Sequence, residues 1–158
     1  MDQLNEIIIK EAEIGDSDRL TEIALLSKRY WQYPERWLDL WREELAVSTH
    51  YINDNHVYKA LEEQEIVGFY ALRIFKDEII ELDHLWVIPS QIGKGVGRAL
   101  CTHAKNWSLQ MGFHTLKVVT DPNAVDFYLR MGGEVISSKD YQIDGITRKL
   151  PILLFKIQ

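Results

Sequence analysis

Apolar positions in the first third of the chain recur every three or four residues, the spacing of a helix with one buried face. An apolar run predicts a short strand over residues 7–13, which Gly15 interrupts. Asp16 is suited to cap a helix that continues to about Ser27, and Pro34 suits the first turn of a second helix. The two apolar stripes consist of Leu20, Ile23, Ala24, Ser27 and Trp31, and of Trp37, Leu38, Trp41 and Leu45.

After residue 55 the period changes to two, because apolar and polar residues begin to alternate as they do along a half-buried strand. This alternation predicts three strands, over residues 56–62, 65–75 and 78–87. The polar turns at residues 62–64 and 76–77 are too short for a crossover connection. The three strands should therefore form antiparallel hairpins.

Glycines and prolines divide the remainder into helices and strands. A glycine turn at residues 93–97 leads into a helix that ends at Gly112, with apolar residues at Val96, Leu100, Ala104, Trp107 and Met111. Then follow a strand over residues 116–120, a helix opened by Asp121-Pro122 and closed by Gly132-Gly133, and strands over residues 134–138 and 147–156. The order β-α-α-β-β-β-α-β-α-β-β, without linker or repeat, predicts one α/β domain over residues 1–158 with a mixed sheet.

The most informative segment is the glycine turn, in which Gly93, Gly95 and Gly97 alternate with other residues directly before a helix. Glycine permits backbone conformations closed to other residues, so that neighbouring amide N–H groups can converge on one point. The free N–H groups and the positive end of the following helix add to this effect, which predicts a site for phosphate or pyrophosphate. Lys94 and Arg98 supply positive charge at its rim.

Two nucleotide-binding motifs do not fit this turn. The dinucleotide-binding pattern GxGxxG fails because Arg98 stands where the third glycine is required. The turn also follows a hairpin meander rather than the first strand of the chain, and the pattern GxxxxGK followed by Ser or Thr is absent. The alternative interpretation is a plain strand-to-helix turn that binds no ligand, although such a turn needs one glycine rather than three.

Composition narrows the classes of protein further. The 158 residues include 18 Lys+Arg and 24 Asp+Glu, a formal net charge of −6, which argues against nucleic acid or a membrane surface as a partner. The single cysteine, Cys101, excludes an internal disulfide and fits a reducing compartment. Because there is also no long apolar run and no basic leader before Glu6, we expect a cytoplasmic protein. The histidines lack the spacing of ligands, so no metal is expected.

From Leu85 to Leu100 the sequence resembles the GNAT superfamily of acetyl-CoA-dependent N-acetyltransferases. The family signature Q/R-x-x-G-x-G/A corresponds here to Ile92-Gly93-Lys94-Gly95-Val96-Gly97, with Ile92 at the usual Arg or Gln position and Gln91 one residue earlier. The resemblance implies a GNAT-like fold and acetyl-CoA as cofactor, its pyrophosphate held chiefly by backbone amides. It also implies that the pantetheine arm lies beside the fourth strand and pairs with the backbone of Leu85, Trp86 and Val87.

A second motif extends from Asp121 to Gly132 and resembles the family pattern N-x-x-A-x-x-F/L-Y-x-x-x-G, with Asp121 in place of the frequent Asn. The resemblance makes Tyr128 the candidate general acid for the leaving thiolate. It places Asn123 and Phe127 beside the pantetheine and adenosine end of the cofactor. Both aromatic residues of the motif can alternatively be explained as core packing.

The complete set of expected cofactor-binding residues is Leu85, Trp86, Val87, Ile92, Gly93, Lys94, Gly95, Val96, Gly97, Arg98, Asn123 and Phe127.

Amide formation from a thioester also needs a base for the incoming ammonium. The fourth predicted strand offers Glu81, Asp83 and His84, of which Glu81 and Asp83 share one face by alternation. A bulge before Leu85 would change the direction of His84. The first candidate for the base is Glu81, acting directly or through water, and the second is His84. Alternatively, a water chain removes the proton, and these side chains are solvated residues of the sheet face without a catalytic role. Direct attack is preferred over an acyl-enzyme at Cys101, which has no activating partner in the sequence.

The acceptor side is indicated by five aromatic residues within twelve positions, namely Tyr30, Trp31, Tyr33, Trp37 and Trp41. In the resembled family the first two helices lie beside the acceptor groove, so Trp31 and Tyr33, together with Asp83, are the candidate acceptor-binding residues. Packing of the helices onto the sheet is the alternative for these aromatics.

The resemblance predicts transfer of an acetyl group from acetyl-CoA to a primary amine of a small molecule or peptide. The alternatives are a non-catalytic acyl-CoA-binding or regulatory module with the same fold, and a nucleotide-dependent oxidoreductase. The last predicted strands, which include Arg148 and Pro151, offer a surface for a homodimer.

Overall fold

Alternating apolar residues in the middle and at the end of the chain pair into a seven-stranded sheet in the computed structural model, which describes residues 6–76 and 79–158. The strands are β1 Ile8–Glu11, β2 His56–Glu62, β3 Glu65–Phe75, β4 Ile79–Val87, β5 Thr115–Val119, β6 Glu134–Ile143 and β7 Ile146–Lys156. Their order is β1-β2-β3-β4-β5-β7-β6, and each neighbouring pair is antiparallel except β4 and β5. The predicted mixed sheet is confirmed.

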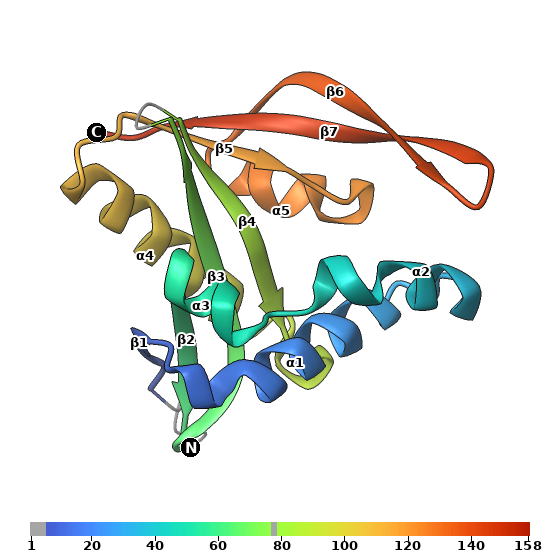
Figure 1. Ribbon diagram of the computed structural model, residues 1–158. Coiled ribbons are helices and arrows are strands. Elements are labelled where there is room, and N and C mark those ends of the chain that lie inside the picture. Colours follow the sequence, from blue (N-terminus) through green and yellow to red (C-terminus); the bar gives the residue numbers. More distant parts are fainter. Residues whose placement is uncertain (1–5, 77–78) are drawn as a thin grey trace.

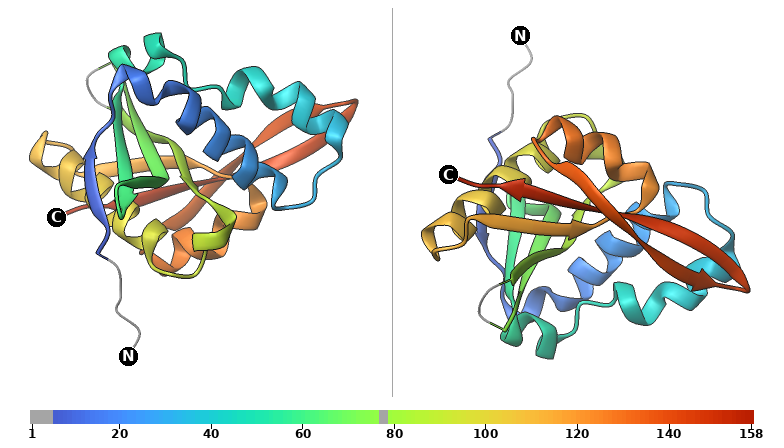
Figure 2. Two further views of the ribbon diagram at one scale, coloured as in Figure 1. Left: turned by 90° about the horizontal axis from the view of Figure 1, so that it is seen from below. Right: turned by 90° about the horizontal axis from the view of Figure 1, so that it is seen from above.

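Helices cover both faces of this sheet (Figures 1 and 2). The helices are α1 Ser17–Arg29, α2 Glu35–Leu45 and α3 Thr49–Asp54 on one side, and α4 Val96–Gln110 and α5 Val125–Arg130 on the other, with short 3₁₀ turns η1 Ile14–Asp16, η2 Pro89–Gln91 and η3 Pro122–Ala124. Leu20, Leu38 and Phe69 are buried in the core under α1–α3. Leu100 and Phe155 are buried in the core under α4 and α5. Burying one such side chain stabilises the fold by roughly 1.5–3 kcal/mol, so apolar contacts fix both helix layers.

Most predicted elements occur where the sequence indicated them, and α3 is the main difference. This helix has six residues, too few for a periodic pattern to be recognised. It begins after Ser48, whose Oγ accepts a hydrogen bond from the backbone N–H of Tyr51. Strand β6 also continues to Ile143, well beyond the predicted end, because it stays paired with β7 up to their shared turn.

Two further observations concern helices. Met111, predicted as an apolar position of the helix, follows the end of α4 and is exposed, whereas Cys101 and Ser108 within α4 are buried. None of the helices in the described residues combines the length and the apolar character needed to cross a membrane. Asp77 of a predicted turn, Glu78 at a predicted strand start and residues 1–5 lie outside the described residues.

The parallel pair β4 and β5 separates along its length. Within the described residues the two strands register at a single pair of positions, Glu81 and Lys117. They begin side by side and then diverge, since β4 turns toward α1 while β5 stays paired with β7 (Figure 1). The end of β4 after Glu81 therefore has a free edge on the side of β5.

Strand β4 also contains the predicted bulge. Ala71 of β3 registers with His84, but the next residue, Leu72, registers with Leu82, so Asp83 is the extra residue. A bulge puts two successive side chains on one face of a strand. Asp83 and His84 accordingly both contact Tyr51 of α3.

Candidate active site

Left-handed backbone conformations shape the turn between η2 and α4. Gly93 and Gly95 have φ angles of +83° and +89°, a region that costs other residues roughly 1–2 kcal/mol. A Cβ atom at either position would meet nothing within 4 Å, so the turn borders open space. Helix α4 begins at Val96, and its first N–H groups have no acceptor within the helix. With the exposed side chains of Lys94 and Arg98 beside them, these groups can bind a pyrophosphate.

Two other predicted cofactor residues, Ile92 and Phe127, border this turn. The Ile92 side chain is exposed and, being apolar, adds no hydrogen-bond donor. A Cβ atom at Gly97 would lie 3.4 Å from the Phe127 ring, so Phe127 packs against the first turn of α4. Asn123 is directed elsewhere, because its Nδ2 donates a hydrogen bond of 3.0 Å to the Tyr33 hydroxyl.

The free edge of β4 carries the three residues predicted to pair with pantetheine. Leu85, Trp86 and Val87 register with β3 on their other side. The Val87 carbonyl accepts a hydrogen bond of 2.7 Å from Ser27 Oγ of α1. An extended molecule inserted between β4 and β5 can therefore pair with the remaining backbone groups of this segment, as an added strand does.

Tyr128 lies in α5 and belongs to the core under α4 and α5. Its side chain is 5% exposed, and its ring lies edge-on to Phe127 and Phe155 at centroid distances of 5.1 and 6.1 Å. Burial raises the pKa of its hydroxyl far above the ordinary value, and the Cys101 thiol adds to the shift. Among the described residues no fully enclosed side-chain oxygen lacks a hydrogen-bond partner, and this hydroxyl has none, so its oxygen is not completely enclosed. A protonated hydroxyl in that position can donate to a leaving group.

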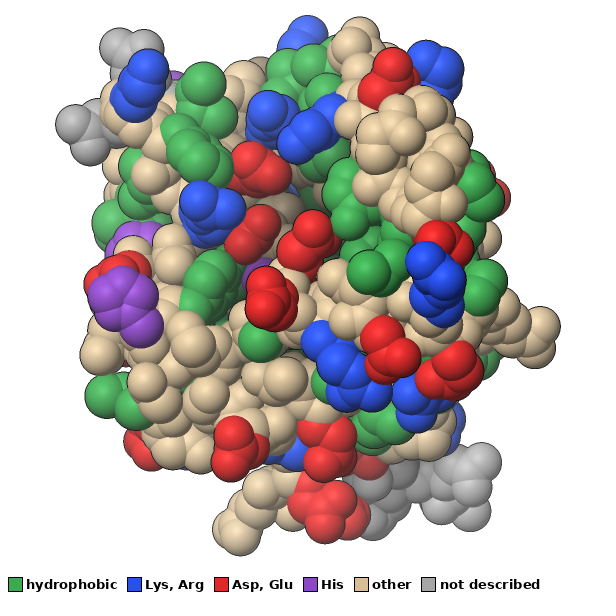
Figure 3. Space-filling view, turned by 45° about the vertical axis from the view of Figure 1, so that its right-hand side comes forward, with side chains coloured by type: hydrophobic (Ala, Val, Ile, Leu, Met, Phe, Trp, Pro, Cys, Tyr) green, Lys and Arg blue, Asp and Glu red, His purple; other side chains and the backbone are tan. Residues whose placement is uncertain are grey.

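Glu81 lies on the opposite face of β4 from the α4 core. Leu82 is buried in that core, so alternation directs Glu81 and Asp83 toward the side of α1–α3. Burial raises the pKa of the Glu81 carboxyl, and the charge of its register partner Lys117 partly opposes the shift. A carboxylate with a raised pKa is a stronger base near neutral pH than an exposed one. Acidic side chains gather around a hollow on this side of the molecule (Figure 3).

His84 is buried, and its lone pair is already engaged. The Trp86 Nε1–H donates a hydrogen bond of 2.9 Å to His84 Nδ1. A neutral imidazole has one lone-pair nitrogen, so the proton of this ring is on Nε2, 3.7 Å from Asp83 Oδ2. Burial lowers the pKa of the imidazole, although Asp83 opposes the shift. The ring is thus neutral and poorly placed to accept another proton.

Asp83 connects β4 to α3. Its Oδ2 accepts a hydrogen bond of 2.5 Å from the Tyr51 hydroxyl, and its Oδ1 lies 3.9 Å from Arg73 Nη1. Burial, the Asp83 charge and the hydrogen bond raise the pKa of Tyr51, which keeps its hydroxyl protonated. The Asp83 carboxylate is therefore held in one orientation beside Glu81.

A second group of polar side chains lies near the far end of the gap. This Asp121 cluster consists of Lys28 of α1, Tyr33 of the α1–α2 loop, Asp121 after β5 and Arg148 of β7. Asp121 Oδ2 lies 2.7 Å from Lys28 Nζ and accepts a 2.7 Å hydrogen bond from the Tyr33 hydroxyl. Arg148 Nη2 donates to that hydroxyl at 2.7 Å. Three segments distant in sequence thus meet at one carboxylate.

Burial governs the ionisation of this cluster. Burial alone would raise the pKa of Asp121, but the charge and hydrogen bond of Lys28 and the hydrogen bonds from Asn123 and Tyr33 together lower the pKa. The pKa of Lys28 is lowered by burial and by Arg148, although Asp121 opposes this. Burial, aided by Asp121, raises the pKa of Tyr33 to about 12. The three shifts fit one carboxylate shared by two cations and a protonated phenol.

A pocket of about 160 Å³ lies beside the Asp121 cluster. We call it the β4–β7 pocket, because its lining includes Trp86 of β4 and Arg148 of β7. Lys28, Trp41, Glu44 and Tyr141 also line it. The aromatic walls, the charged groups and the nearby end of β4 suit an acceptor molecule.

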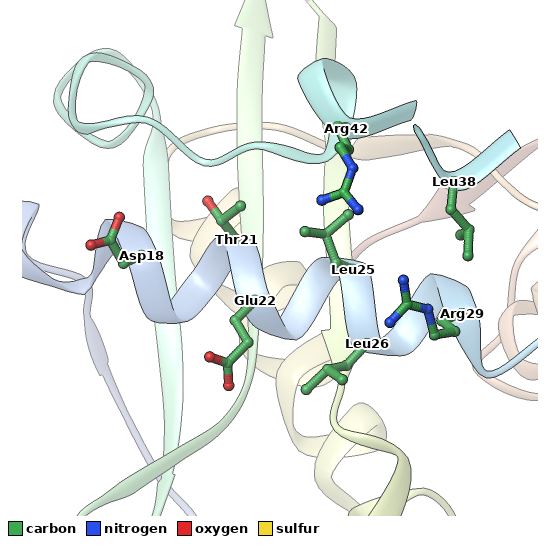
Figure 4. Close-up of a pocket in the computed structure, with 8 residues that line it drawn as sticks. All are labelled: Asp18, Thr21, Glu22, Leu25, Leu26, Arg29, Leu38 and Arg42. Carbon is green, nitrogen blue, oxygen red and sulfur yellow. The ribbon is translucent and has the colours of Figure 1, made fainter. Parts of the chain in front are cut away.

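A second pocket, of about 350 Å³, lies between α1 and α2 (Figure 4). All of its lining residues belong to these two helices; Leu25, Leu38 and Arg42 are among them. It shares no residue with β4, β5 or the glycine turn, so it is separate from the groups described above.

Sequence reasoning missed several residues that the fold brings to this site. Tyr51 lies on the unpredicted α3, Lys28 carried no pattern, Asp121 was noted only for its place in a motif, and Arg148 only for a possible dimer surface. The signal available for Asp121 was an acidic residue directly after a strand. Trp31, a predicted acceptor residue, is 38% exposed, lies edge-on to Tyr30 and does not line the β4–β7 pocket.

Comparison with known proteins is consistent with this geometry. Residues 19–133 match the family model described as "Acetyltransferase (GNAT) family". A streptothricin acetyltransferase from Escherichia coli is 26% identical over 110 residues. That similarity covers 68% of this chain and 63% of the relative, so the chain spans less than two thirds of the relative's length.

Solved structures share the fold over nearly the whole chain. The PaiA N-acetyltransferase from Thermoplasma acidophilum in complex with coenzyme A superposes with a TM-score of 0.79 and 23% identity, covering 96% of this chain and 99% of that one. A GCN5-related N-acetyltransferase structure from Rhodopseudomonas palustris has a TM-score of 0.80 and 17% identity, covering 99% of both chains. The predicted fold is therefore confirmed.

Proposed function

The chain belongs to the GNAT acetyltransferase family, and from this premise we propose that it transfers the acetyl group of acetyl-CoA to a primary amine. The acceptor is a small molecule or a peptide amine, and the amine attacks the thioester directly while both substrates are bound. The observation that carries the proposal is the divergence of β4 from β5, with the glycine turn at the end of the resulting gap.

The residues around this gap fit acetyl-CoA. The open space at Gly93 and Gly95, the free amides at the start of α4 and the side chains of Lys94 and Arg98 would hold the pyrophosphate. The backbone of residues 85–87 would pair with the pantetheine arm, and Phe127 would flank its adenosine end. When bound, acetyl-CoA supplies an acyl group activated as a thioester. A backbone N–H of the same segment would polarise the thioester carbonyl.

We assign the base to Glu81 and the acid to Tyr128. Glu81 has the raised pKa that suits a base near neutral pH, and it would remove the ammonium proton directly or through a water molecule. His84 remains the second candidate, but its engaged Nδ1 favours a role in fixing Asp83 and Trp86. Tyr128 keeps its proton at physiological pH and would deliver it to the leaving thiolate.

Direct attack agrees with the state of the single cysteine. Cys101 is buried, and burial raises the pKa of its thiol to about 11. A protonated, buried thiol is a poor nucleophile. The amine itself therefore attacks, held in near-attack geometry between β4 and the helices α1–α3.

We place the acceptor amine between Asp83 and the β4–β7 pocket. Asp83 would attract the ammonium, and Tyr33 would border the rest of the molecule, with Trp31 at the outer rim. The name of the streptothricin acetyltransferase relative indicates an acceptor that is a small molecule rather than a protein.

We further propose a cytoplasmic location and a homodimer, both of which the sequence suggests. Cell fractionation tests the location, and sedimentation of the purified protein tests the dimer.

The test is thiol release from acetyl-CoA in the presence of a panel of primary amines. We expect at least one amine to raise the rate of thiol release above the background of hydrolysis, with an acetylated product seen by mass spectrometry. Binding of CoA without thiol release for any amine would instead support the non-catalytic module.

A further inference from the structure

The β4–β7 pocket offers hydrogen-bond donors that are not used within the chain. Arg148 has five N–H groups, and its contacts to polar side chains of the described residues are made by Nη2, which donates to the Tyr33 hydroxyl and lies 3.9 Å from Asp121 Oδ2. Its side chain is 14% exposed. Since no fully buried side-chain nitrogen of the described residues lacks a partner, the other N–H groups of Arg148 are not completely enclosed and border some open space. The pocket that Arg148 lines provides that space.

Acceptor capacity at the inner end of the pocket is already taken. The Asp121 carboxylate accepts from Lys28 Nζ, from the Tyr33 hydroxyl and from the backbone N–H of Asn123. Lys28 Nζ lies 4.2 Å from the centre of the Trp41 ring, and among the described residues its three N–H groups have one hydrogen-bond partner, Asp121. The groups that can still form hydrogen bonds beside Trp41 are therefore N–H donors of Lys28 and Arg148.

Charge leads to the same conclusion. Lys28 and Arg148 together carry two positive charges and Asp121 carries one negative charge. Glu44 also lines the pocket and its charge acts on Lys28, but Glu44 is exposed, so solvent screens it more than the mostly buried side chains of Lys28, Arg148 and Asp121. The inner end thus has an excess positive charge within a half-buried, aromatic surrounding, where electrostatic attraction is stronger than in water.

We propose that the β4–β7 pocket binds a carboxylate of the acceptor, held by Arg148 and Lys28. This inference rests on the proposed function, because the same pocket is lined by Trp86, whose backbone lies at the predicted thioester site. The acceptor is then an amine that carries a carboxylate a few bonds away, as an amino acid does. The pocket volume of about 160 Å³ is below the roughly 300–1,000 Å³ of sites for drug-sized ligands, which suits a small acceptor such as an amino acid.

The experiment compares three forms of the same amine: phenylalanine, phenylalaninamide and phenethylamine, with leucine, leucinamide and isoamylamine as a second series. The readout is kcat/KM for thiol release. We expect each free acid to exceed its amide roughly 10- to 100-fold, the range of hydrogen bonds to charged groups. The ammonium group of each amide has a lower pKa than that of the acid, so a larger fraction of the amide is unprotonated and able to attack. A preference for the acid must therefore come from binding of its carboxylate. Equal or better activity with the amides or the decarboxylated amines would overturn the proposal.

Arg148→Gln should reduce this preference, because KM should rise at least about tenfold more for the acids than for the amides. Lys149→Gln is the matched control, because Lys149 is the next residue, is 73% exposed and pairs with Asp140. An equal loss for acids and amides in Arg148→Gln would show a merely structural role and would contradict the proposal. If Arg148→Gln does not fold, Lys28→Gln and the wild-type series decide the question.

Equilibrium binding separates this inference from the proposed function. Trp41 and Trp86 line the pocket, so N-acetylphenylalanine should change the tryptophan fluorescence and N-acetylphenylalaninamide should not. If N-acetylphenylalanine binds, its amide does not, and no amine causes thiol release, the carboxylate site is supported and acetyl transfer is rejected. Thiol release with amines but no binding of the acid would reject the site alone. Absence of both would reject both.

Discussion

At the scale of single residues, the environment decides which polar groups can take part in chemistry. Tyr128 and Glu81 have pKa values raised by burial, which keeps the first protonated and makes the second a stronger base. His84, a more familiar base, has its lone pair occupied by Trp86. The bulge at Asp83 is the cause of this arrangement, because it places both Asp83 and His84 on the acceptor side of β4.

Tyr128→Phe removes one hydroxyl and keeps the ring that packs against Phe127 and Phe155. We expect kcat to fall roughly 10²- to 10⁴-fold, the usual contribution of a general acid, with the Kd for CoA nearly unchanged. Tyr30→Phe, at an exposed tyrosine, serves as the control. Steady-state kinetics together with calorimetric titration of CoA checks this; unaltered turnover would remove Tyr128 from the acid role.

Glu81→Gln tests the base through pH dependence. Only the ionised carboxylate accepts a proton, so kcat/KM of the wild type should fall as pH decreases through the Glu81 pKa, which burial raises above its ordinary value. In the variant this acid limb should disappear and kcat/KM near neutral pH should drop about 100-fold or more. Glu65→Gln, at an exposed glutamate of β3, should keep the wild-type profile. Superimposable profiles for Glu81→Gln and wild type would leave deprotonation to water.

At the scale of elements, the junction of β4 and α4 combines two features that each depend on backbone geometry. The edge of β4 becomes free because β5 follows β7 instead. The glycine turn then leaves its amides open at the start of α4 because Gly93 and Gly95 adopt positive φ. A strand edge for pantetheine thus leads directly to a helix end for pyrophosphate.

Gly95→Glu would place a carboxylate in the cradle of amides. Because like charges brought together cost several kcal/mol, the Kd for CoA should rise at least about 100-fold. Gly112→Glu is a matched control at the other end of α4, where φ is +94° and a Cβ atom also meets nothing within 4 Å. Both variants carry the same backbone strain, so a weakening of CoA binding by both to the same degree would contradict the assignment of the turn.

At the scale of the whole molecule, the Asp121 cluster ties the N-terminal helices to the C-terminal strands. Lys28 and Tyr33 come from the first helix and the loop after it, whereas Arg148 comes from the last strand. These parts lie on the two sides of the gap between β4 and β5, which the sheet itself does not close. The cluster therefore contributes to the shape of the acceptor side as well as to stability.

Asp121→Asn leaves Lys28 buried without its counter-ion. Breaking such a pair costs about 3–5 kcal/mol, which should appear as a lower free energy of unfolding in urea at pH 7. The pKa of Asp121 is lowered in the folded state, so its contribution is complete above the unfolded value of about 3.9 and is lost as pH falls through the lowered one. The difference between wild type and variant should therefore shrink only in strong acid.

The matched control for that measurement is Asp140→Asn. Asp140 pairs with Lys149, but both side chains are largely exposed, so the expected change is at most about 1 kcal/mol. A cost for Asp121→Asn no larger than for this control would mean that the cluster does not hold the two parts of the molecule together.

The sequence by itself determined the elements, the glycine turn and the fold class. Helix and strand periods are local, and a positive φ at Gly93 or Gly95 is signalled by glycine itself, so short stretches suffice to predict them. The motif that ends at Gly132 likewise placed Tyr128 on a helix beside the turn. The short helix α3 escaped because six residues carry too little periodicity.

Only the tertiary structure decided which charged groups meet and which nitrogen of His84 carries the proton. The hydrogen bond from Lys28 to Asp121 joins residues 93 positions apart, and that from Arg148 to Tyr33 spans 115 positions. Desolvation and pairing of such groups depend on how distant segments pack, which no local pattern records. The same reason explains why the gap between β4 and β5, set by the pairing of β5 with β7, became visible only in the folded chain.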